Sequence, residues 1–483
     1  MTSDSTMHCP EADLRPAAAA RHHSDSNAVR LVRAHDISAV TPTFPQLAFL
    51  VEPSRTSLNM CSAMWIAGPL DEGALERALI ALVDRHDALR ATFSHDGSQA
   101  WMHLGPSCQG LLRTIRLTDE GDQSVERRAE TELHDERRRQ FDLANGPPVR
   151  ALLMTISPLR HLFALTVHHL VADKWSINII KRDLACLYED ELTGSTTIAA
   201  GPQIRFIDFA HWQARLHATE QYSRQLDYWR RELADVERTA SSAGGEAFAP
   251  GSRIAPEYVD VLPPEGFREL IERVAVRRGC TAYALLMTAL QLSLAEYFGT
   301  EQQVVWSPVS RRSRAEIEQS VGMYTNLIMV ATRVRKEITL WELLGAIARK
   351  VLMAYVNGDV SALTAVMQAP EVMPAMPLIG LNFVKLPNEC GWRLAGTSVS
   401  PINLRGDDGD GFCALEALVR FDRGRMSIVI KSKTEVFPPG SGRRIGAGLL
   451  FAVESIAAAP DMKVGDFMEA WRERRSAIAA LPG

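Results

Sequence analysis

The stretch that decides the fold reads RHLFALTVHHLVADKWSINIIKRDLACL and covers residues 160–187. Residues 160–168 alternate and are rich in apolar and β-branched types, which predicts a β-strand. From residue 177 onward apolar residues recur at helical spacing, and Ser176 is placed to cap that helix, with Gly194 beyond its end. A strand that runs directly into a helix is typical of mixed α/β folds.

Helices and strands are predicted on both sides of this stretch. Asp71 can cap a helix whose leucines recur at helical spacing. Residues 238–253 are small, polar and rich in Gly and Ser, which predicts a linker. Beyond the linker the pattern predicts helices at 265–278 and 281–298, strands at 302–307, 325–333, 377–384 and 426–434, and a final amphipathic helix at about 443–458. The predicted class is therefore α/β in both halves.

The length of 483 residues suits several domains or one large body with two lobes. Residues 1–38 are rich in Ala, Ser, Asp and His and lack periodicity, so we expect a disordered N-terminal tail. We divide the rest of the chain into an N-terminal lobe of residues 39–235 and a C-terminal lobe of residues 236–483.

Composition argues against several functional classes. The formal net charge of -5 gives no electrostatic case for binding nucleic acid. The seven cysteines are scattered without CxxC spacing, which argues against a disulfide framework and a zinc site and favours a reducing cytoplasm. No apolar signal segment is seen near the start, and the most apolar run, residues 283–298, is interrupted by polar side chains. We therefore expect a cytoplasmic protein that binds no nucleic acid, membrane or metal.

The adjacent histidines of HHLVAD, residues 168–173, are the strongest chemical signal in the chain. Alternation along a strand sends His168 and His169 to opposite faces, so they cannot easily share one role or one metal ion. One of them can be held in the fold while the other faces an open site. Histidine titrates near neutrality and is the usual side chain for taking a proton from an attacking amine or hydroxyl.

HHLVADKWS, residues 168–176, resembles the active-site motif of the condensation domain family, part of the chloramphenicol-acetyltransferase-like superfamily. Other segments resemble the same family in its order and spacing: RHDALRATF at 85–93, FDLANGP at 141–147, FIDFAHW at 206–212, YW at 228–229, SPVSRRSRAEIE at 307–318, VGMYTN at 321–326 and RFD at 420–422. These segments together make the resemblance far more specific than one short motif.

The resemblance implies a fold and a set of roles. The fold is two chloramphenicol-acetyltransferase-like lobes in a V-shaped pseudo-dimer, with an active-site tunnel between them. His169 would be the catalytic residue, as a general base or as an orienting and charge-stabilising group, and His168 would be structural. Asp173 would form a buried pair with Arg312 of the second lobe, so we expect Asp173 variants to fail largely through folding.

Lys174 stands where the family has glycine, and it is the largest departure from the family pattern. Three interpretations remain open: an ammonium that reaches solvent or a nearby carboxylate, a group that recognises a carboxylate on the acceptor, or a site that is inactive. Lys174, Trp175 and Ser176 are the candidates for the acceptor side of the site. Tyr324 and Asn326 are the candidates for residues that line the tunnel.

The implied function is acyl transfer from the phosphopantetheine thioester of a carrier protein to a small amine or alcohol, which forms an amide or an ester. No carrier, adenylation or thioesterase signature is visible in the chain, so we expect a free-standing enzyme that meets its carrier in trans. No bound cofactor is expected, and a monomer is expected because two lobes in one chain already build the tunnel. Two alternatives remain: a catalytically silent recruitment module, and a CoA-dependent acyltransferase of the same superfamily.

Overall fold

The structure is a computed structural model, and it describes residues 30–34, 37–50, 58–96, 99–117, 122–198, 201–234, 236, 256–312, 314–368, 378–385, 392–402, 404, 413–422 and 425–479. The predicted linker at 238–253 lies outside the described residues, as does most of the predicted tail. The part of that tail that is described is bound to the fold: the amide of Ala34 donates to Asp208 Oδ1 at 3.0 Å, and Arg205 donates to the Ala34 carbonyl at 2.8 Å. The described fold therefore begins before residue 39.

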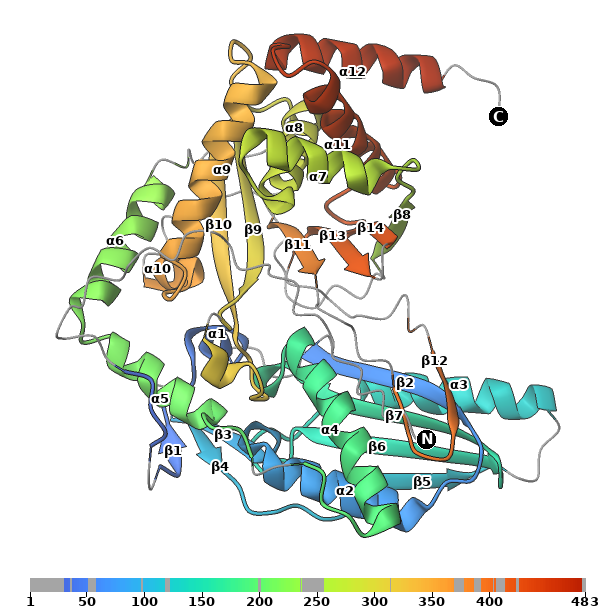
Figure 1. The fold of residues 1–483 in the computed structure, drawn as a ribbon. Helices are drawn as coiled ribbons and strands as arrows, with labels where there is room; N and C mark the ends of the chain where they lie inside the picture. The colour runs from blue at the N-terminus through green and yellow to red at the C-terminus, as the bar shows by residue number, and fades with distance from the viewer. Residues whose placement is uncertain are drawn as a thin grey trace, which may run out of the picture.

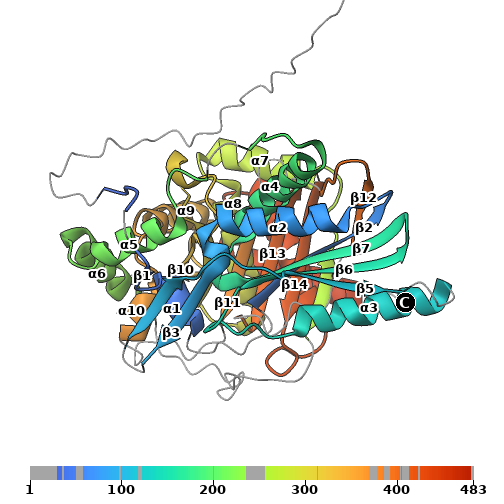
Figure 2. The same ribbon diagram turned by 90° about the horizontal axis from the view of Figure 1, so that it is seen from below.

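The lower body in Figure 1 is built on a five-stranded sheet. In order across the sheet, its strands are β12 (Ser398–Pro401), β2 (Asn59–Ala67), β7 (Arg160–His168), β6 (Val149–Ser157) and β5 (Leu112–Arg116). Helices α2 (Glu72–Arg85) and α4 (Lys174–Thr193) cover one face, and α3 (Asp122–Arg138) covers the other (Figure 2). Odd-numbered residues of β7 pack toward α2 and α4, and even-numbered ones toward α3.

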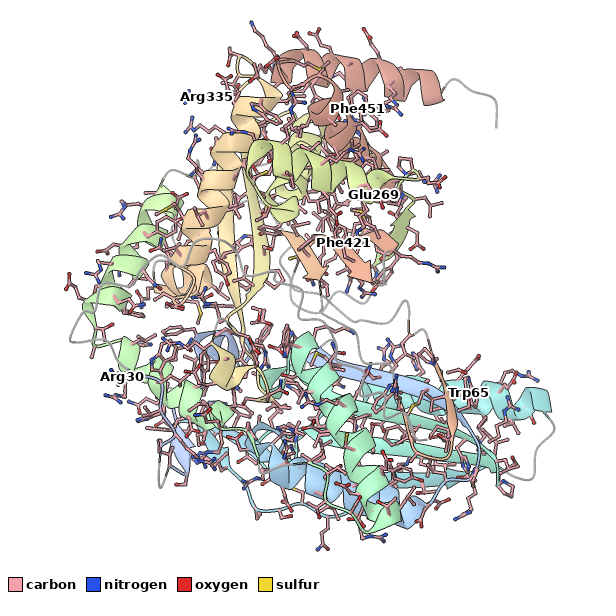
Figure 3. The ribbon with its side chains drawn as sticks, in the orientation of Figure 1. Arg30, Trp65, Glu269, Arg335, Phe421 and Phe451 are labelled. Atoms are coloured by element: carbon pink, nitrogen blue, oxygen red, sulfur yellow. The ribbon has the colours of Figure 1, made fainter. Side chains whose placement is uncertain are left out.

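The upper body contains a six-stranded sheet. In order, its strands are β10 (Thr325–Arg333), β9 (Gln302–Ser310), β11 (Ile379–Lys385), β13 (Leu415–Asp422), β14 (Arg425–Ser432) and β8 (Glu257–Val261). The helices packed on it are α7 (Phe267–Arg278), α8 (Ala282–Phe298), α9 (Leu340–Val356) and α11 (Ser441–Ala458). Figure 3 places Trp65 in the lower body, and Phe421 and Phe451 in the upper body.

The two sheets share one order of antiparallel and parallel strand pairs. In the lower sheet, β2 pairs with β7 and β7 with β6 in antiparallel fashion, and β6 pairs with β5 in parallel. In the upper sheet, β8, β14, β13 and β11 repeat this sequence of antiparallel, antiparallel and parallel pairs. β7 leads into α4, and β14 leads into α11. The repeat is in the backbone, and the sequence shows no internal repeat, because different side chains can satisfy the same pattern of burial.

Each lobe receives an element from the other half of the chain. Strand β12, from the C-terminal half, pairs antiparallel with β2 at the edge of the lower sheet. Helix α6 (Glu220–Ala234), from the N-terminal half, lies beside the upper body, where the indole N–H of Trp229 donates to the Val360 carbonyl at 2.9 Å. A boundary between residues 235 and 236 therefore does not separate the two bodies completely, because each body contains an element from the other half of the chain.

Several predicted elements are confirmed. The strand predicted at 160–168 is β7, and the helix predicted after Asp71 is α2, with the Asp71 carboxylate accepting the amide hydrogen of Ala74 at 2.8 Å. Gly194 ends α4 in a left-handed conformation with φ of 70°. The predicted apolar helix is α8, which is buried on nearly all sides, and no helix among the described residues is long and apolar enough to cross a bilayer.

Two local predictions are wrong. The cap of α4 is Asp173 rather than Ser176, because the carboxylate of Asp173 accepts the Ser176 amide hydrogen. The helix predicted at about 443–458 is not the last one, since α12 (Val464–Ala479) follows it and packs on α11 through Phe451. Strand β13 was not predicted, because its residues LEALVRFD favour a helix and only pairing with β11 and β14 makes them a strand.

The remaining elements lie outside the two large sheets, and among them α1 lies between the two bodies (Figure 1). They are α1 (Phe44–Leu50), α5 (Phe206–Leu216), α10 (Ala362–Gln368), the 3-10 turns η2 (Asp87–Arg90), η3 (His169–Val171) and η4 (Ala315–Ile317), and the small sheet of β1 (Ala39–Val40), β4 (Ala100–Leu104) and β3 (Ala91–His95). Of these, α1 and η3 are the elements that build the site.

Candidate active site

His169 opens the turn η3, directly after the last residue of β7. Its imidazole is half-buried, and Nδ1 lies 2.7 Å from the carbonyl oxygen of Ala172. A carbonyl only accepts, so Nδ1 carries the hydrogen in the neutral ring and Nε2 keeps a lone pair. The ring also stacks on Phe49 of α1, with 5.9 Å between the ring centroids. The geometry therefore leaves one basic nitrogen in a ring whose orientation is fixed on two sides.

His168 is buried and has a different role. Its Nδ1 accepts the amide hydrogen of Leu170 at 3.2 Å, and its ring meets the edge of Phe141. Burial lowers the pKa of His168 to about 3, and the neighbouring charges of His169 and Arg150 act in the same direction. His168 therefore stays neutral and shapes the turn. The two histidines separate because His169 has already left the strand, and not through strand alternation alone.

Asp173 joins the two lobes. One carboxylate oxygen accepts from the amide and the hydroxyl of Ser176, both at 2.7 Å, and the other accepts from the Tyr324 amide at 3.2 Å. The Arg312 guanidinium lies 3.1 Å from Asp173 Oδ1, and both side chains are nearly fully buried, with 2% and 4% of their surfaces exposed. A charge pair so deeply buried and so fully hydrogen-bonded is structural.

The junction between Asp173 and Arg312 is also tightly packed. Arg312 donates to the carbonyls of Ile317 and Ser320, each at 2.7 Å, and its guanidinium lies 4.1 Å from the centre of the Tyr324 ring. A Cβ atom on Gly322 would lie 2.1 Å from a ring carbon of Phe206. Only glycine fits at that position.

The three acceptor-side candidates lie in different surroundings. Lys174 is exposed at the first residue of α4, so this position does not require the backbone freedom of glycine. The Trp175 indole donates to the Glu318 carbonyl at 2.9 Å. Ser176 is fully buried, with its hydroxyl within hydrogen-bond distance of Asp173, Gly322 and Arg312. The Ser176 hydroxyl is therefore hydrogen-bonded within the junction, and an acceptor role for this residue stays a prediction.

The two tunnel candidates lie in the packed core. Tyr324 and Asn326 are each 1% exposed. The Tyr324 hydroxyl donates to Ser320 at 2.8 Å, and the Asn326 amide donates to the Gly358 carbonyl at 2.7 Å. Both side chains are buried and hydrogen-bonded within the fold, and their lining of a tunnel stays a prediction.

Arg311 has a structural explanation as well. Its guanidinium forms an ion pair with Asp359 and donates to the Tyr355 carbonyl at 3.0 Å. These contacts hold the loop that follows α9.

Two pockets lie elsewhere on the N-terminal lobe. One, of about 520 Å³, is lined by residues of β2, α3 and β12, among them Trp65. The other, of about 220 Å³, is lined by Phe141 and Arg150 among others, on the lobe that carries His168. His169 is not part of either wall, so a tunnel that reaches His169 remains a prediction.

Two residues of the site were missed at the level of sequence. They are Gln46 and Phe49, both on α1, which contact the η3 turn and the His169 ring. A weak signal was present, since Thr43 and Gln46 have the spacing of a capping box. That pattern predicts the start of a helix, and it gives no indication that the helix packs on a turn more than a hundred residues further along the chain.

Comparison with known proteins adds the family context. A subunit of the linear gramicidin synthase of Brevibacillus parabrevis is 29% identical over 411 residues, which cover 83% of this chain and 5% of that synthase subunit. The chain therefore spans a small fraction of the length of that relative. Two solved structures share the fold: the X-domain from teicoplanin biosynthesis in a complex with OxyB, and the first condensation domain of the CDA synthetase.

The fold agrees closely with both. The X-domain has a TM-score of 0.77 at 21% identity, covering 91% of this chain and 97% of that one. The CDA condensation domain has a TM-score of 0.68 at 20% identity, covering 89% and 98%. The mixed α/β fold with two chloramphenicol-acetyltransferase-like lobes is thereby confirmed. A family model described as "Condensation domain" matches residues 46–470, so the chain belongs to the condensation domain family of non-ribosomal peptide synthesis.

Proposed function

We propose that this chain transfers an acyl group from a carrier-protein phosphopantetheine thioester to a small amine or alcohol. The observation that carries the proposal is the 2.7 Å contact between His169 Nδ1 and the Ala172 carbonyl, which leaves Nε2 as the basic nitrogen of a half-exposed ring. Nε2 takes the proton of the attacking N–H or O–H as the new C–N or C–O bond forms. The C–S bond then breaks, and the imidazolium returns the proton to the sulfur.

The second part of the proposal concerns how the reactants meet. A tunnel between the lobes would hold the thioester and the acceptor beside His169, which makes a bimolecular step effectively unimolecular. We propose that the carrier is supplied in trans and that the chain works as a cytoplasmic monomer. The junction between Asp173 and Arg312 supports the monomer, because one chain supplies both sides of it. No group other than the carrier-bound phosphopantetheine is required for this chemistry.

Lys174 is proposed to act on the acceptor side. It is exposed, and it lies directly after the Asp173 cap, five residues beyond His169 in the chain. An ammonium at this place suits an acceptor that carries a carboxylate. Trp175 is held by the Glu318 carbonyl and supports the same edge of the site without touching the chemistry.

The test of the proposed function is direct. Wild-type protein and the variant His169→Gln are mixed with a carrier protein loaded with an acyl chain, and candidate amines and alcohols are added. Intact mass of the carrier reports acyl loss. We expect acceptor-dependent loss with wild type and a rate about 10²- to 10⁴-fold lower with the variant. Equal rates for the two folded proteins would contradict the role of His169. Replacing the carrier thioester by a CoA thioester separates this function from that of a CoA-dependent acyltransferase.

A second candidate is a catalytically silent recruitment module. It is favoured by one observation: the similar X-domain is found in a complex with OxyB, which is a partner protein and not a small acceptor. This candidate predicts no acyl loss with any acceptor, and it predicts that His169→Gln leaves partner binding unchanged. A pull-down of the assembly-line partners with both proteins therefore distinguishes the two functions.

A further inference from the structure

We infer that Gln46, together with Phe49 on the same helix, positions the catalytic imidazole of His169. This inference rests on the proposed function. It concerns α1, a helix of the N-terminal segment that none of the motif residues belongs to. The two side chains reach the backbone of the η3 turn and the face of the imidazole ring, respectively.

In the η3 turn, the backbone N–H and C=O of Leu170 are both hydrogen-bonded to side chains. Leu170 follows His169 directly, and its amide hydrogen is accepted by His168 Nδ1 at 3.2 Å. Its carbonyl oxygen accepts from the side-chain amide of Gln46 at 2.6 Å. Gln46 is fully buried, so water cannot replace that hydrogen bond. The peptide groups next to the catalytic residue are therefore fixed by two buried side chains.

The orientation of the Gln46 amide is set by its other end. Its Oε1 accepts the amide hydrogen of Thr43 at 2.9 Å and lies 3.2 Å from the Thr43 hydroxyl. Because a backbone N–H can only donate, the oxygen must face Thr43 and the nitrogen must face the Leu170 carbonyl. The start of α1 is itself held, since the Phe44 amide donates to Gln213 on α5 at 3.0 Å. Gln46 thus connects two rigid elements to the turn.

Phe49 lies one turn further along α1 and contacts the ring itself. The centroids of Phe49 and His169 are 5.9 Å apart and the ring planes are inclined by 28°. With the Ala172 carbonyl on Nδ1, this contact limits both the rotation and the tilt of the imidazole. A movement of α1 would change the turn and the ring together. Both contacts act through His169, so these are positioning residues rather than catalytic ones.

The C-terminal lobe offers a matched control for Gln46. Gln291 on α8 is also fully buried, and its amide likewise donates to one backbone carbonyl, that of Val330, at 2.9 Å. It contacts neither η3 nor α1. Gln46→Met and Gln291→Met each remove one buried hydrogen bond to a backbone carbonyl, and only the first removes one next to the site. Gln46→Met also removes the contacts of Oε1 with Thr43, so the larger loss of stability is expected in that variant. Both variants should lower the midpoint of denaturation.

The experiment reads the His169 ring directly and does not depend on turnover. Protein labelled with ¹⁵N-histidine is examined by NMR, and the His169 signals are assigned by their loss in His169→Gln. We expect wild type to show the Nδ1–H tautomer, and Gln46→Met to show a mixture of both tautomers. Gln291→Met should match wild type. In the acyl-transfer assay, Gln46→Met should lower kcat roughly 10- to 100-fold with little change in KM.

The outcomes separate the inference from the function it rests on. An unchanged His169 spectrum in Gln46→Met overturns the inference, whatever the activity. A changed spectrum in a chain that transfers no acyl group supports the positioning role and contradicts the proposed function alone. If Gln46→Met does not fold, Phe49→Leu decides by the same spectrum, because Phe49 is only half-buried and its loss leaves the hydrogen bonds of α1 intact. Phe49→Tyr keeps the stacked ring and should restore both the wild-type spectrum and kcat.

Discussion

Two connections occupy equivalent places in the two lobes and differ in what holds them. Residues 169–173 lead from β7 to α4, and residues 433–440 lead from β14 to α11. The first ends in Asp173, whose carboxylate caps the helix and binds Arg312 across the lobes. The second ends in Gly440, which has φ of 87° and makes no side-chain cap. Two connections of the same topology are therefore stabilised differently. The first is held by a buried charge pair, and the second depends on the positive φ that glycine allows.

The difference explains why only one lobe carries a candidate site. His169 opens the connection after β7, and the buried side chains of His168 and Gln46 hold the two backbone polar groups of Leu170. The connection after β14 contains no histidine and is held by the buried ring of Phe437. Both lobes therefore have a connection at the same position of the fold, and only the side chains of the connection after β7 can support the proposed chemistry.

The largest effect should come from breaking the charged connection. Arg312→Ala leaves the carboxylate of Asp173 buried without its partner, and we expect a loss of about 3–5 kcal/mol in the free energy of unfolding. Denaturation by urea measures it. Arg474→Ala, which removes an exposed ion pair with Glu454, is the control and should cost less than about 1 kcal/mol. Similar losses for the two variants would show that the junction is not the special feature of the β7 connection.

The second effect is a dependence of the free energy of unfolding on pH, which comes from His168 at the start of the β7 connection and has no counterpart at the β14 connection. His168 has a pKa of about 3 in the fold, lowered chiefly by burial, against 6.5 in the unfolded chain. The unfolded chain therefore binds more protons between pH 3 and 6.5. The stability is complete above pH 6.5 and falls as the pH drops through that window, by about 2 kcal/mol at pH 5.

The variant His168→Asn keeps an acceptor for the Leu170 amide and removes the titrating ring. Unfolding free energies at pH 7 and pH 5 should differ by about 2 kcal/mol less in this variant than in wild type. His134→Asn, at an exposed position of α3, is the control for exchanging a histidine for an asparagine away from the site. If the unfolding free energy of His168→Asn changes with pH as much as that of wild type, His168 is not held neutral by the fold.

The third effect concerns the connection held by backbone conformation. Gly440→Ala places a Cβ where nothing lies within 4 Å, so any cost comes from the positive φ alone. We expect a loss of about 1–2 kcal/mol, measured as a lower urea midpoint. Gly73→Ala in α2 has helical φ and should be neutral or stabilising. A neutral Gly440→Ala would remove the contrast drawn between the two connections.

The smallest effect is expected at Lys174, the first residue of α4. Lys174→Gly should weaken apparent affinity for an acidic acceptor by up to about fivefold, equivalent to about 1 kcal/mol for an exposed charge pair. Affinity for a neutral acceptor of the same size should not change. Equal affinity of both proteins for the acidic acceptor would remove the proposed role of Lys174 and favour an ammonium that reaches solvent or a nearby carboxylate.

Local patterns account for what could be predicted from the sequence. β7 was predicted to the residue because it is a short run of mainly apolar residues that leads directly into a helical pattern, and α2 because a capping aspartate precedes a regular leucine pattern. The pairing of Asp173 with Arg312 followed from the resemblance of two separate motifs, and the two side chains lie 3.1 Å apart in the structure. β13 was missed because its residues favour a helix in isolation, and its strand partners come from elsewhere in the chain.

The sequence by itself determined the α/β class, the position of the histidine pair and the family that the chain resembles, because each is written in spacing along the chain. Only the tertiary structure decided which motif residues face the site. It buried Ser176, Tyr324 and Asn326. It also brought Gln46 to the turn that His169 opens, and Phe49 to the imidazole ring. The physical reason is that burial and hydrogen-bond partners depend on contacts between distant segments, and no local pattern encodes those contacts.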